Sequence, residues 1–164
     1  MNTESEFHAP WANSLKWMTL FSVAILSGVA LLGLSSGPRG NAIWISALVL
    51  GPLAIIAVGA CFIIRGYVLT PNEMIVKRAG WKSRIDLHDL QSVEIDRDAM
   101  AKSVRLFGNG GLFCFAGLFR NKKLGSYRVF ATDPVRAVVL RFTNRTVVVT
   151  PHEPENFAAA LSRR

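Results

Sequence analysis

Two uncharged apolar runs decide the fold of this chain: WMTLFSVAILSGVALLGL at residues 17–34 and AIWISALVLGPLAIIAVGACFII at residues 42–64. Neither run contains Asp, Glu, Lys or Arg, and only the segment SSGPRGN separates them. About 18 or more apolar residues are enough to cross the hydrocarbon core of a bilayer as a helix. A charge at the bilayer centre costs on the order of 3 kcal/mol, so the absence of charge is informative. The two runs predict a transmembrane helical hairpin over residues 15–65.

These runs allow two other interpretations: buried helices of a soluble protein, and a cleaved signal peptide. Buried soluble helices are usually shorter and carry polar residues on one side. The segment before the first run contains two acidic residues, Glu4 and Glu6, and one basic residue, Lys16. It therefore lacks the positive charge with which a signal peptide begins. We therefore expect a retained anchor, preceded by a short, disordered cytoplasmic tail at residues 1–14.

Small residues and one proline mark the expected helices. Ala24 and Gly28 in the first helix, and Ala47 and Gly51 in the second, have the spacing that lets helix backbones approach closely. They are candidates for the contact within the hairpin or between copies of the chain. Pro52 predicts a kink or a local loosening of the second helix.

The positive charges give the hairpin an orientation. The connecting loop offers only Arg39, whereas Lys16 precedes the first helix and Arg65 and several lysines and arginines follow the second. Basic residues near transmembrane ends are retained in the cytoplasm. The sequence thus predicts a multi-pass protein of the bacterial inner membrane, with both termini and the domain at residues 66–164 in the cytoplasm.

After residue 65 the pattern changes to that of strands, over a length that suits one domain. About seven β-rich runs are separated by turn residues, at 67–70, 73–77, 81–85, 91–95, 126–131, 137–142 and 145–150. A helix follows, because Pro154 suits a first helical position and Glu155 suits the positive end of the helix dipole. A sheet of this size must bury one face, so a bent sandwich or barrel with a helix at its end is expected.

This layout resembles the small bacterial pleckstrin-homology-like (PH-like) domain proteins. The segments that carry the resemblance are RLFGNGGLF (105–113), GLF (117–119), LGSY (124–127), VVVTPHEPENF (147–157), YVL (67–69) and IDLHDLQSV (85–93). The resemblance implies an all-β split barrel or sandwich of about seven strands with a C-terminal capping helix. It does not imply a particular ligand, since fold does not carry function.

The stretch at residues 105–119 is rich in glycine and phenylalanine. A dinucleotide fingerprint that started at Gly108 would need a glycine where Phe113 stands, and no P-loop lysine follows, so a nucleotide site is not expected. If residues 112–117 form a strand, Phe113 and Phe115 lie on one face and Cys114 and Ala116 on the other. One of these faces could supply the core, or the Phe-bearing face could meet lipid headgroups or a partner. The sequence leaves both possibilities open.

Basic residues gather at two turns of the expected domain. Four surround the turn at Ala79-Gly80, and three more lie in the segment RNKK at residues 120–123. Several cations near an anionic bilayer attract it by about 1 kcal/mol each. The candidate contacts with lipid or a partner are Lys77, Arg78, Lys82, Arg84, Arg105, Phe113, Phe115, Arg120, Lys122 and Lys123.

No catalytic, cofactor or metal constellation stands out. His8, His88 and His152 are isolated, and Cys61 and Cys114 fall in different parts of the chain. The acidic strip at residues 86–98 lacks the pairing that acid–base catalysis needs. No recognition helix points to nucleic acid.

The expected function is a non-enzymatic, membrane-anchored binding module for a protein segment or for anionic lipid headgroups. The alternative is an assembly subunit that acts through its transmembrane hairpin. The sequence predicts neither the partner nor the oligomeric state.

Overall fold

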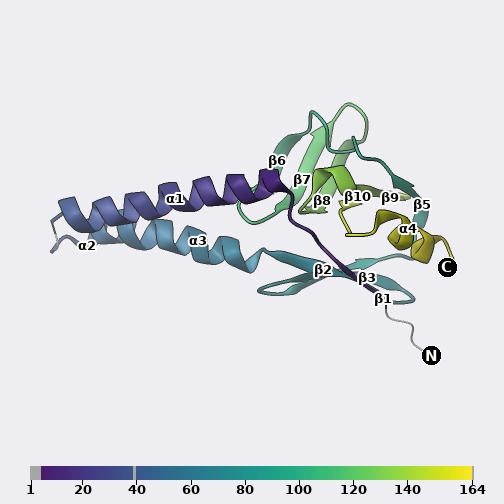
Figure 1. Ribbon diagram of the computed structural model, residues 1–164, viewed down its shortest axis with the longest axis horizontal. Helices are drawn as coiled ribbons and strands as arrows, with labels where there is room; N and C mark the ends of the chain where they lie inside the picture. Colours follow the sequence, from purple (N-terminus) through teal and green to yellow (C-terminus); the bar gives the residue numbers. More distant parts are fainter. Residues whose placement is uncertain (1–4, 39, 164) are drawn as a thin grey trace.

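The computed structural model describes residues 5–38 and 40–163, and its most extended part is a helical hairpin (Figure 1). The hairpin consists of α1 (Asn13–Ser36), the short α2 (Ala42–Ile45), the π-helical turn η1 (Ser46–Leu50) and α3 (Gly51–Cys61). Both arms are long and apolar enough to cross a membrane, and only 17% of the most apolar 18-residue window of each is buried. Helices in a soluble core would be mostly buried, so this exposure suits a lipid environment. The second arm ends three residues earlier than the apolar run, because Ile64 begins a strand.

The π-helical turn lies directly before Pro52. Proline has no N–H, and its ring clashes with the carbonyl four residues earlier. The helix therefore forms a π-helical turn at this point, in which the N–H of Gly51 donates to the carbonyl of Ser46, five residues earlier. The local loosening predicted at Pro52 is confirmed.

The two arms touch near the loop rather than at the small-residue pairs. A Cβ on Gly33 would lie 2.9 Å from the Cβ of Leu48, and the indole of Trp44 donates a 3.0 Å hydrogen bond to the Gly33 carbonyl. A Cβ on Gly28 would meet nothing within 4 Å, and one on Gly51 would meet only the carbonyl of Ser46 in its own arm. The prediction that these pairs make the contact within the hairpin is therefore wrong, because they face away from it.

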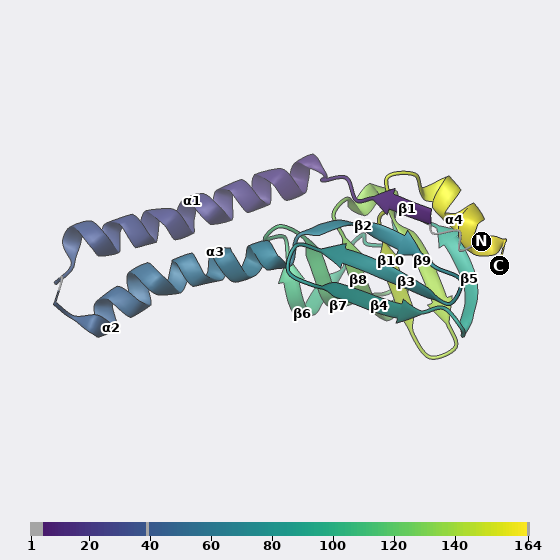
Figure 2. The same ribbon diagram turned by 90° about the horizontal axis from the view of Figure 1, so that it is seen from below.

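The described N-terminal segment begins with a strand ahead of the hairpin. Strand β1 (Ser5–His8) pairs antiparallel with β2 (Ile64–Leu69), and the ring of Phe7 packs edge-on against Phe157 at 5.1 Å. The expected disordered tail is thus wrong for residues 5–14, since a partner strand and a core contact hold them; residues 1–4 lie outside the described part. The hairpin is consequently inserted between two neighbouring strands of one sheet (Figure 2).

The domain contains two sheets. The first has the order β1-β2-β3-β4, with β3 (Glu73–Arg78) and β4 (Lys82–Asp86). The second has the order β5-β9-β10-β8-β7-β6, and its strands are β5 (Leu90–Ile95), β6 (Val104–Gly110), β7 (Phe115–Asn121), β8 (Gly125–Ala131), β9 (Val138–Phe142) and β10 (Thr146–Val149). Neighbours are antiparallel except β8 and β10, which are parallel. The seven expected strands are confirmed, and β1, β6 and β7 are added to them.

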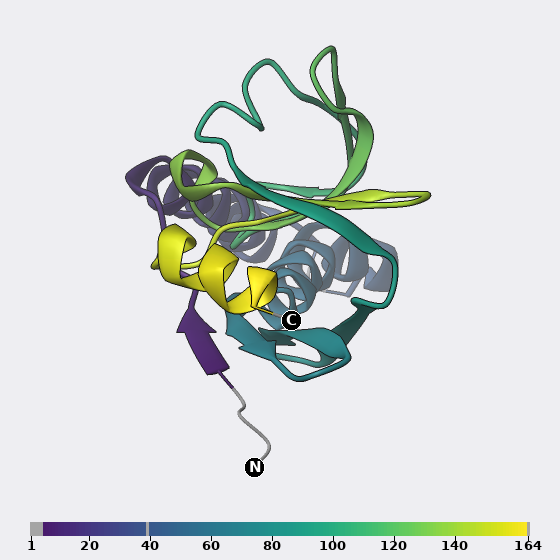
Figure 3. The same ribbon diagram turned by 90° about the vertical axis from the view of Figure 1, so that its right-hand side faces the viewer.

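Helix α4 (Pro154–Ser162) packs at one end of the two sheets (Figure 3). It buries Phe157 and Leu161 in the main core, which lies between the sheets and includes Tyr67, Met74 and Leu140. A second, smaller core lies beneath the segment around Ala99, against the other side of the second sheet. The predicted sandwich with a C-terminal capping helix is confirmed.

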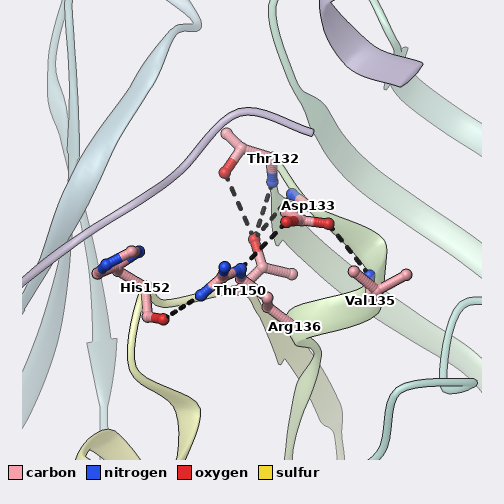
Figure 4. A network of polar contacts seen from close by, with 6 residues as sticks. All are labelled: Thr132, Asp133, Val135, Arg136, Thr150 and His152. Atoms are coloured by element: carbon pink, nitrogen blue, oxygen red, sulfur yellow. Dashed lines mark hydrogen bonds and ion pairs between the residues drawn. The ribbon is translucent and has the colours of Figure 1, made fainter. Parts of the chain in front are cut away.

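A polar junction ties the strand ends beside α1 together (Figure 4). The hydroxyl of Thr150 accepts hydrogen bonds from the backbone N–H groups of Thr132 at 2.9 Å and Asp133 at 3.3 Å. The phenol of Tyr67 donates to the Phe130 carbonyl at 2.6 Å and accepts from the Thr150 N–H at 3.1 Å. Complete burial raises the pKa of Tyr67 to about 12. These bonds link the first sheet to the second through paired buried groups, so the junction is structural.

Candidate functional site

The turn between β3 and β4 is fixed against the end of α3. The N–H of Ala79 donates to the Ile63 carbonyl at 2.9 Å, and that of Gly80 to the Cys61 carbonyl at 3.0 Å. A Cβ on Gly80 would lie 2.8 Å from the Cβ of Cys61, so the approach requires glycine. The basic residues that surround this turn are thereby held where the hairpin meets the domain.

The tip between β6 and β7 is the second point of attachment. The hydroxyl of Thr19 in α1 donates to the Gly111 carbonyl at 3.2 Å and accepts from the Phe113 N–H at 3.0 Å. On the opposite arm, a Cβ on Gly59 would lie 2.8 Å from a methyl carbon of Leu112. The tip therefore touches both helices within their apolar stretches.

The glycine-rich stretch forms a hairpin with an irregular tip, not a strand over residues 112–117. Phe113 has φ +68° and Gly111 φ +132°, and the side chain of Asn109 holds the turn by accepting from the Leu112 N–H at 3.0 Å. Strand β7 accordingly begins at Phe115. The strand considered over residues 112–117 is thus not formed at its first three residues, because left-handed residues and an Asn-held turn interrupt the extended backbone.

Both faces of β7 contribute to packing. Cys114 and Ala116 are buried in the main core, as one of the two expected alternatives requires. Phe115 is half-buried against the second core, and Phe113 is half-buried with its ring 6.3 Å from that of Trp11. The exposed aromatic is instead Phe107 on the edge strand β6, with 79% of its surface accessible. Sequence reasoning missed Phe107 because the strand pairing, not the local pattern, leaves it uncovered.

The basic residues near the β3–β4 turn have different surroundings. Lys77 makes a 2.6 Å ion pair with Glu6 of β1, whereas Arg84 stands 3.7 Å from Glu73 and is largely exposed. Lys82 is exposed at the start of β4. Arg78 is half-buried, with its guanidinium among aromatic rings.

Arg105 is exposed on β6, and its guanidinium donates to the carbonyl of Gly108 at 3.2 Å. It lies beside the hairpin, on the same side of the molecule as the β3–β4 turn. Lys77, Arg78, Lys82 and Phe113 therefore lie at the end of the domain nearest the hairpin. The side chain of Arg105 reaches toward that end from a backbone position opposite Phe119, and Arg84 lies in the middle of β4, opposite Ile75.

The segment RNKK lies at the other end of β7. That strand runs from the tip toward Asn121, so it carries Arg120, Lys122 and Lys123 about 20 Å away from Phe115. Figure 3 shows this turn projecting away from the two helices. Lys123 makes a 2.5 Å ion pair with Asp96, whose hydrogen bond raises the pKa of the lysine. The ten candidates thus do not form one surface.

Two acidic side chains of the strip at residues 86–98 stabilise turns. Asp86 accepts from the His88 N–H at 2.9 Å, and Asp96 from the Asp98 N–H at 3.1 Å. Within residues 5–38 and 40–163, no group of three His, Cys, Asp or Glu residues is placed to hold a metal ion. Burial raises the pKa of the Cys114 thiol to about 11, so the thiol is kept in its unreactive neutral form.

Comparison with known proteins identifies the domain. The sequence profile described as "Bacterial PH domain" matches residues 65–164, from the start of β2 to the end of the chain. Neither a search of curated proteins nor a search of solved structures found a match. Since the profile covers more than half of the sequence and the two sheets with α4 agree with it, this chain belongs to the bacterial PH domain family.

Proposed function

We propose that this protein is a non-enzymatic binding module that holds a PH domain against the cytoplasmic face of the bacterial inner membrane and binds anionic lipid headgroups there. One observation carries the proposal: the β3–β4 turn and the β6–β7 tip are both fixed to the helix ends, so basic side chains meet the bilayer boundary. Cations at that boundary are attracted to anionic headgroups.

The strand pairing supports the same-sided topology. Because β1 pairs with β2, the segments before α1 and after α3 belong to one sheet and lie on the same side of any membrane that the hairpin crosses. The basic surplus of residues 66–164 then favours the cytoplasm for that side, since 16 of the 19 basic residues fall there against 9 of the 11 acidic ones.

Lysine footprinting tests this proposal on the full chain in nanodiscs of phosphatidylcholine, with or without phosphatidylglycerol. We expect the anionic lipid to protect Lys82 from acylation and to leave Lys122 unchanged. Both lysines are exposed, so Lys122 serves as the matched control for a remote position. Equal labelling of Lys82 in both bilayers would contradict the proposal.

The hairpin itself offers a second candidate function, as an assembly surface. Ala24 and Ala47 are exposed, and Gly28 has open space beside it, so both small-residue pairs face outward where another helix could pack closely. Cysteine cross-linking at Ala24 in native membranes would detect such packing. Discrete cross-linked products would favour this function, and their absence alongside lipid-dependent protection of Lys82 would favour lipid binding.

A further inference from the structure

An open groove lies where the edges of the two sheets face each other. Strand β4 is the last strand of the first sheet and β6 the last of the second, and no backbone ladder joins them. A cavity of about 380 Å³ opens there, and the rings of Phe62, Trp81, Phe107 and Phe130 contribute to its walls. We call this cavity the edge groove.

The floor of the edge groove is made by two opposed glycines. Gly108 of β6 and Gly117 of β7 are paired in register, with φ angles of +109° and +135°. A Cβ on either would lie 2.2 Å from a backbone carbonyl oxygen of the opposite strand. The glycines let the two strands approach closely and leave room above them that side chains would otherwise fill.

Arg78 points into the edge groove without an anionic partner. Its guanidinium lies 5.5, 5.3 and 5.2 Å from the ring centres of Phe62, Trp81 and Phe130, and its buried Nε has no hydrogen-bond acceptor among the described residues. Burial lowers the pKa of Arg78. A desolvated cation with an unused donor is costly unless an anion meets it.

A second guanidinium reinforces the positive charge. Arg128 of β8 also lines the groove, and its guanidinium lies 5.6 Å from the centre of the Phe130 ring. The two arginines repel each other, which contributes to the lowered pKa of Arg78. No carboxylate of the described residues lines the groove or makes an ion pair with either arginine. An anion between the two would satisfy both.

The edge groove continues onto the transmembrane helix. A second, predominantly apolar cavity of about 600 Å³ shares Phe62, Phe107 and Gly108 with it and extends along Ile55 and Val58 of α3. One path therefore runs from the apolar surface of the helix to the arginine pair.

We propose that the edge groove binds one anionic phospholipid of the surrounding bilayer, with its phosphate between Arg78 and Arg128 and an acyl chain along α3. This inference rests on the proposed function and names its site and ligand. Arginine forks suit phosphate oxygens, and the apolar cavity suits a hydrocarbon chain. A free phosphate lacks the acyl chain, and the choline cation of a zwitterionic phospholipid would be repelled by the two arginines, so each should bind more weakly than an anionic phospholipid.

Native mass spectrometry of the full chain, released from micelles that contain phosphatidylglycerol, tests the proposal. We expect one phosphatidylglycerol to be retained per chain, and phosphatidylcholine or inorganic phosphate to be retained less. Arg78→Lys and Arg128→Gln should each weaken retention about tenfold, because lysine cannot make the bidentate contact of an arginine and glutamine removes the charge. Arg120→Gln is the matched control, since it removes an exposed arginine on the neighbouring strand outside the groove.

A further variant separates the lipid from a free phosphate. Phe107→Ser changes an exposed side chain, so folding should survive, and it should weaken retention of phosphatidylglycerol without changing that of inorganic phosphate. Equal retention in the Arg78, Arg128 and Arg120 variants would overturn the proposal, as would phosphate binding as tight as lipid binding. Binding of an acidic amphipathic peptide without lipid retention would also overturn it. Lipid-dependent protection of Lys82 that persists after these failures would leave the proposed function standing.

Discussion

Two groups of basic residues in this domain have the same charge but opposite surroundings. Lys123 in the RNKK turn is exposed, already paired with Asp96, and its pKa is raised by that carboxylate. Arg78 in the edge groove is half-buried among aromatic rings, faces another arginine, and its pKa is lowered by burial. The comparison teaches that a buried cation without a carboxylate partner is a better candidate for anion binding than a cluster of exposed, paired cations.

The largest effect should come from removing the space in the groove floor. Gly117→Ala places a Cβ 2.2 Å from the Phe107 carbonyl at a φ of +135°, so we expect a loss of about 3 kcal/mol in the free energy of unfolding. Thermal unfolding in detergent would measure it. Gly125→Ala, at φ +67° with open space around it, is the control and should cost about 1 kcal/mol. Equal losses would show that the close strand approach is not what requires glycine.

The next effect is stabilisation by the lipid itself. A ligand at about 100 times its Kd stabilises the folded state by about 2.7 kcal/mol, so phosphatidylglycerol should raise the melting temperature of the wild-type chain. Tenfold weaker binding leaves about 1.4 kcal/mol of this stabilisation, so Arg78→Lys should lose about half of that rise, and Lys123→Gln should keep all of it. If the two variants lost the rise equally, the contrast between the two basic groups would fail.

A smaller effect is expected at the polar junction behind the groove. Tyr67→Phe leaves the carbonyl of Phe130 and the N–H of Thr150 without their shared partner, at a cost of about 2 kcal/mol. Because the folded pKa of Tyr67 is raised to about 12, its neutral form stabilises the fold below about pH 10, and that contribution is lost as the pH rises through 12. The variant should therefore unfold with a weaker dependence on alkaline pH than the wild type, as chemical denaturation at several pH values would reveal. An unchanged pH dependence would contradict the assignment.

The smallest effect should follow from breaking the exposed ion pair. Lys123→Gln removes the 2.5 Å contact with Asp96, and pairs in solvent contribute little to stability. We expect no resolvable change in the melting temperature at physiological salt. A clear loss of stability would mean that the RNKK turn is more than a solvated turn.

The sequence predicts the elements of the fold that depend on neighbouring residues alone. The hairpin followed from uncharged apolar length, the strands from β-rich runs between turn residues, and α4 from Pro154 at its start. Strand β1 was not predicted, because the four residues SEFH have no signal apart from the distant strand that pairs with them. The irregular turn before β7 is not predicted for a related reason. The φ values of Gly111 and Phe113 depend on how this turn joins two paired strands.

The candidate site was predicted only in part. Charge alone identifies Arg78 and Arg105 as candidates, but it does not single out Arg128 or Phe107, although these two line the same groove as Arg78. One local signal was present: Arg128 and Phe130 alternate on β8 and so share a face. These residues lie near Arg78 only because the edges of the two sheets face each other. The pattern of a single segment cannot predict that arrangement.

The pairing of β1 with β2 has a consequence for any membrane that the hairpin crosses. β1 leaves the ribosome first and can gain its partner only after both helices have inserted and returned the chain to the starting side. A chain in which one helix failed to insert would leave β1 and β2 on opposite sides of the bilayer. Its sheet would keep a bare edge along β2, open to aggregation and to quality-control proteases. Completion of this sheet by the four residues of β1 therefore requires the segments before α1 and after α3 to lie on the same side of such a membrane.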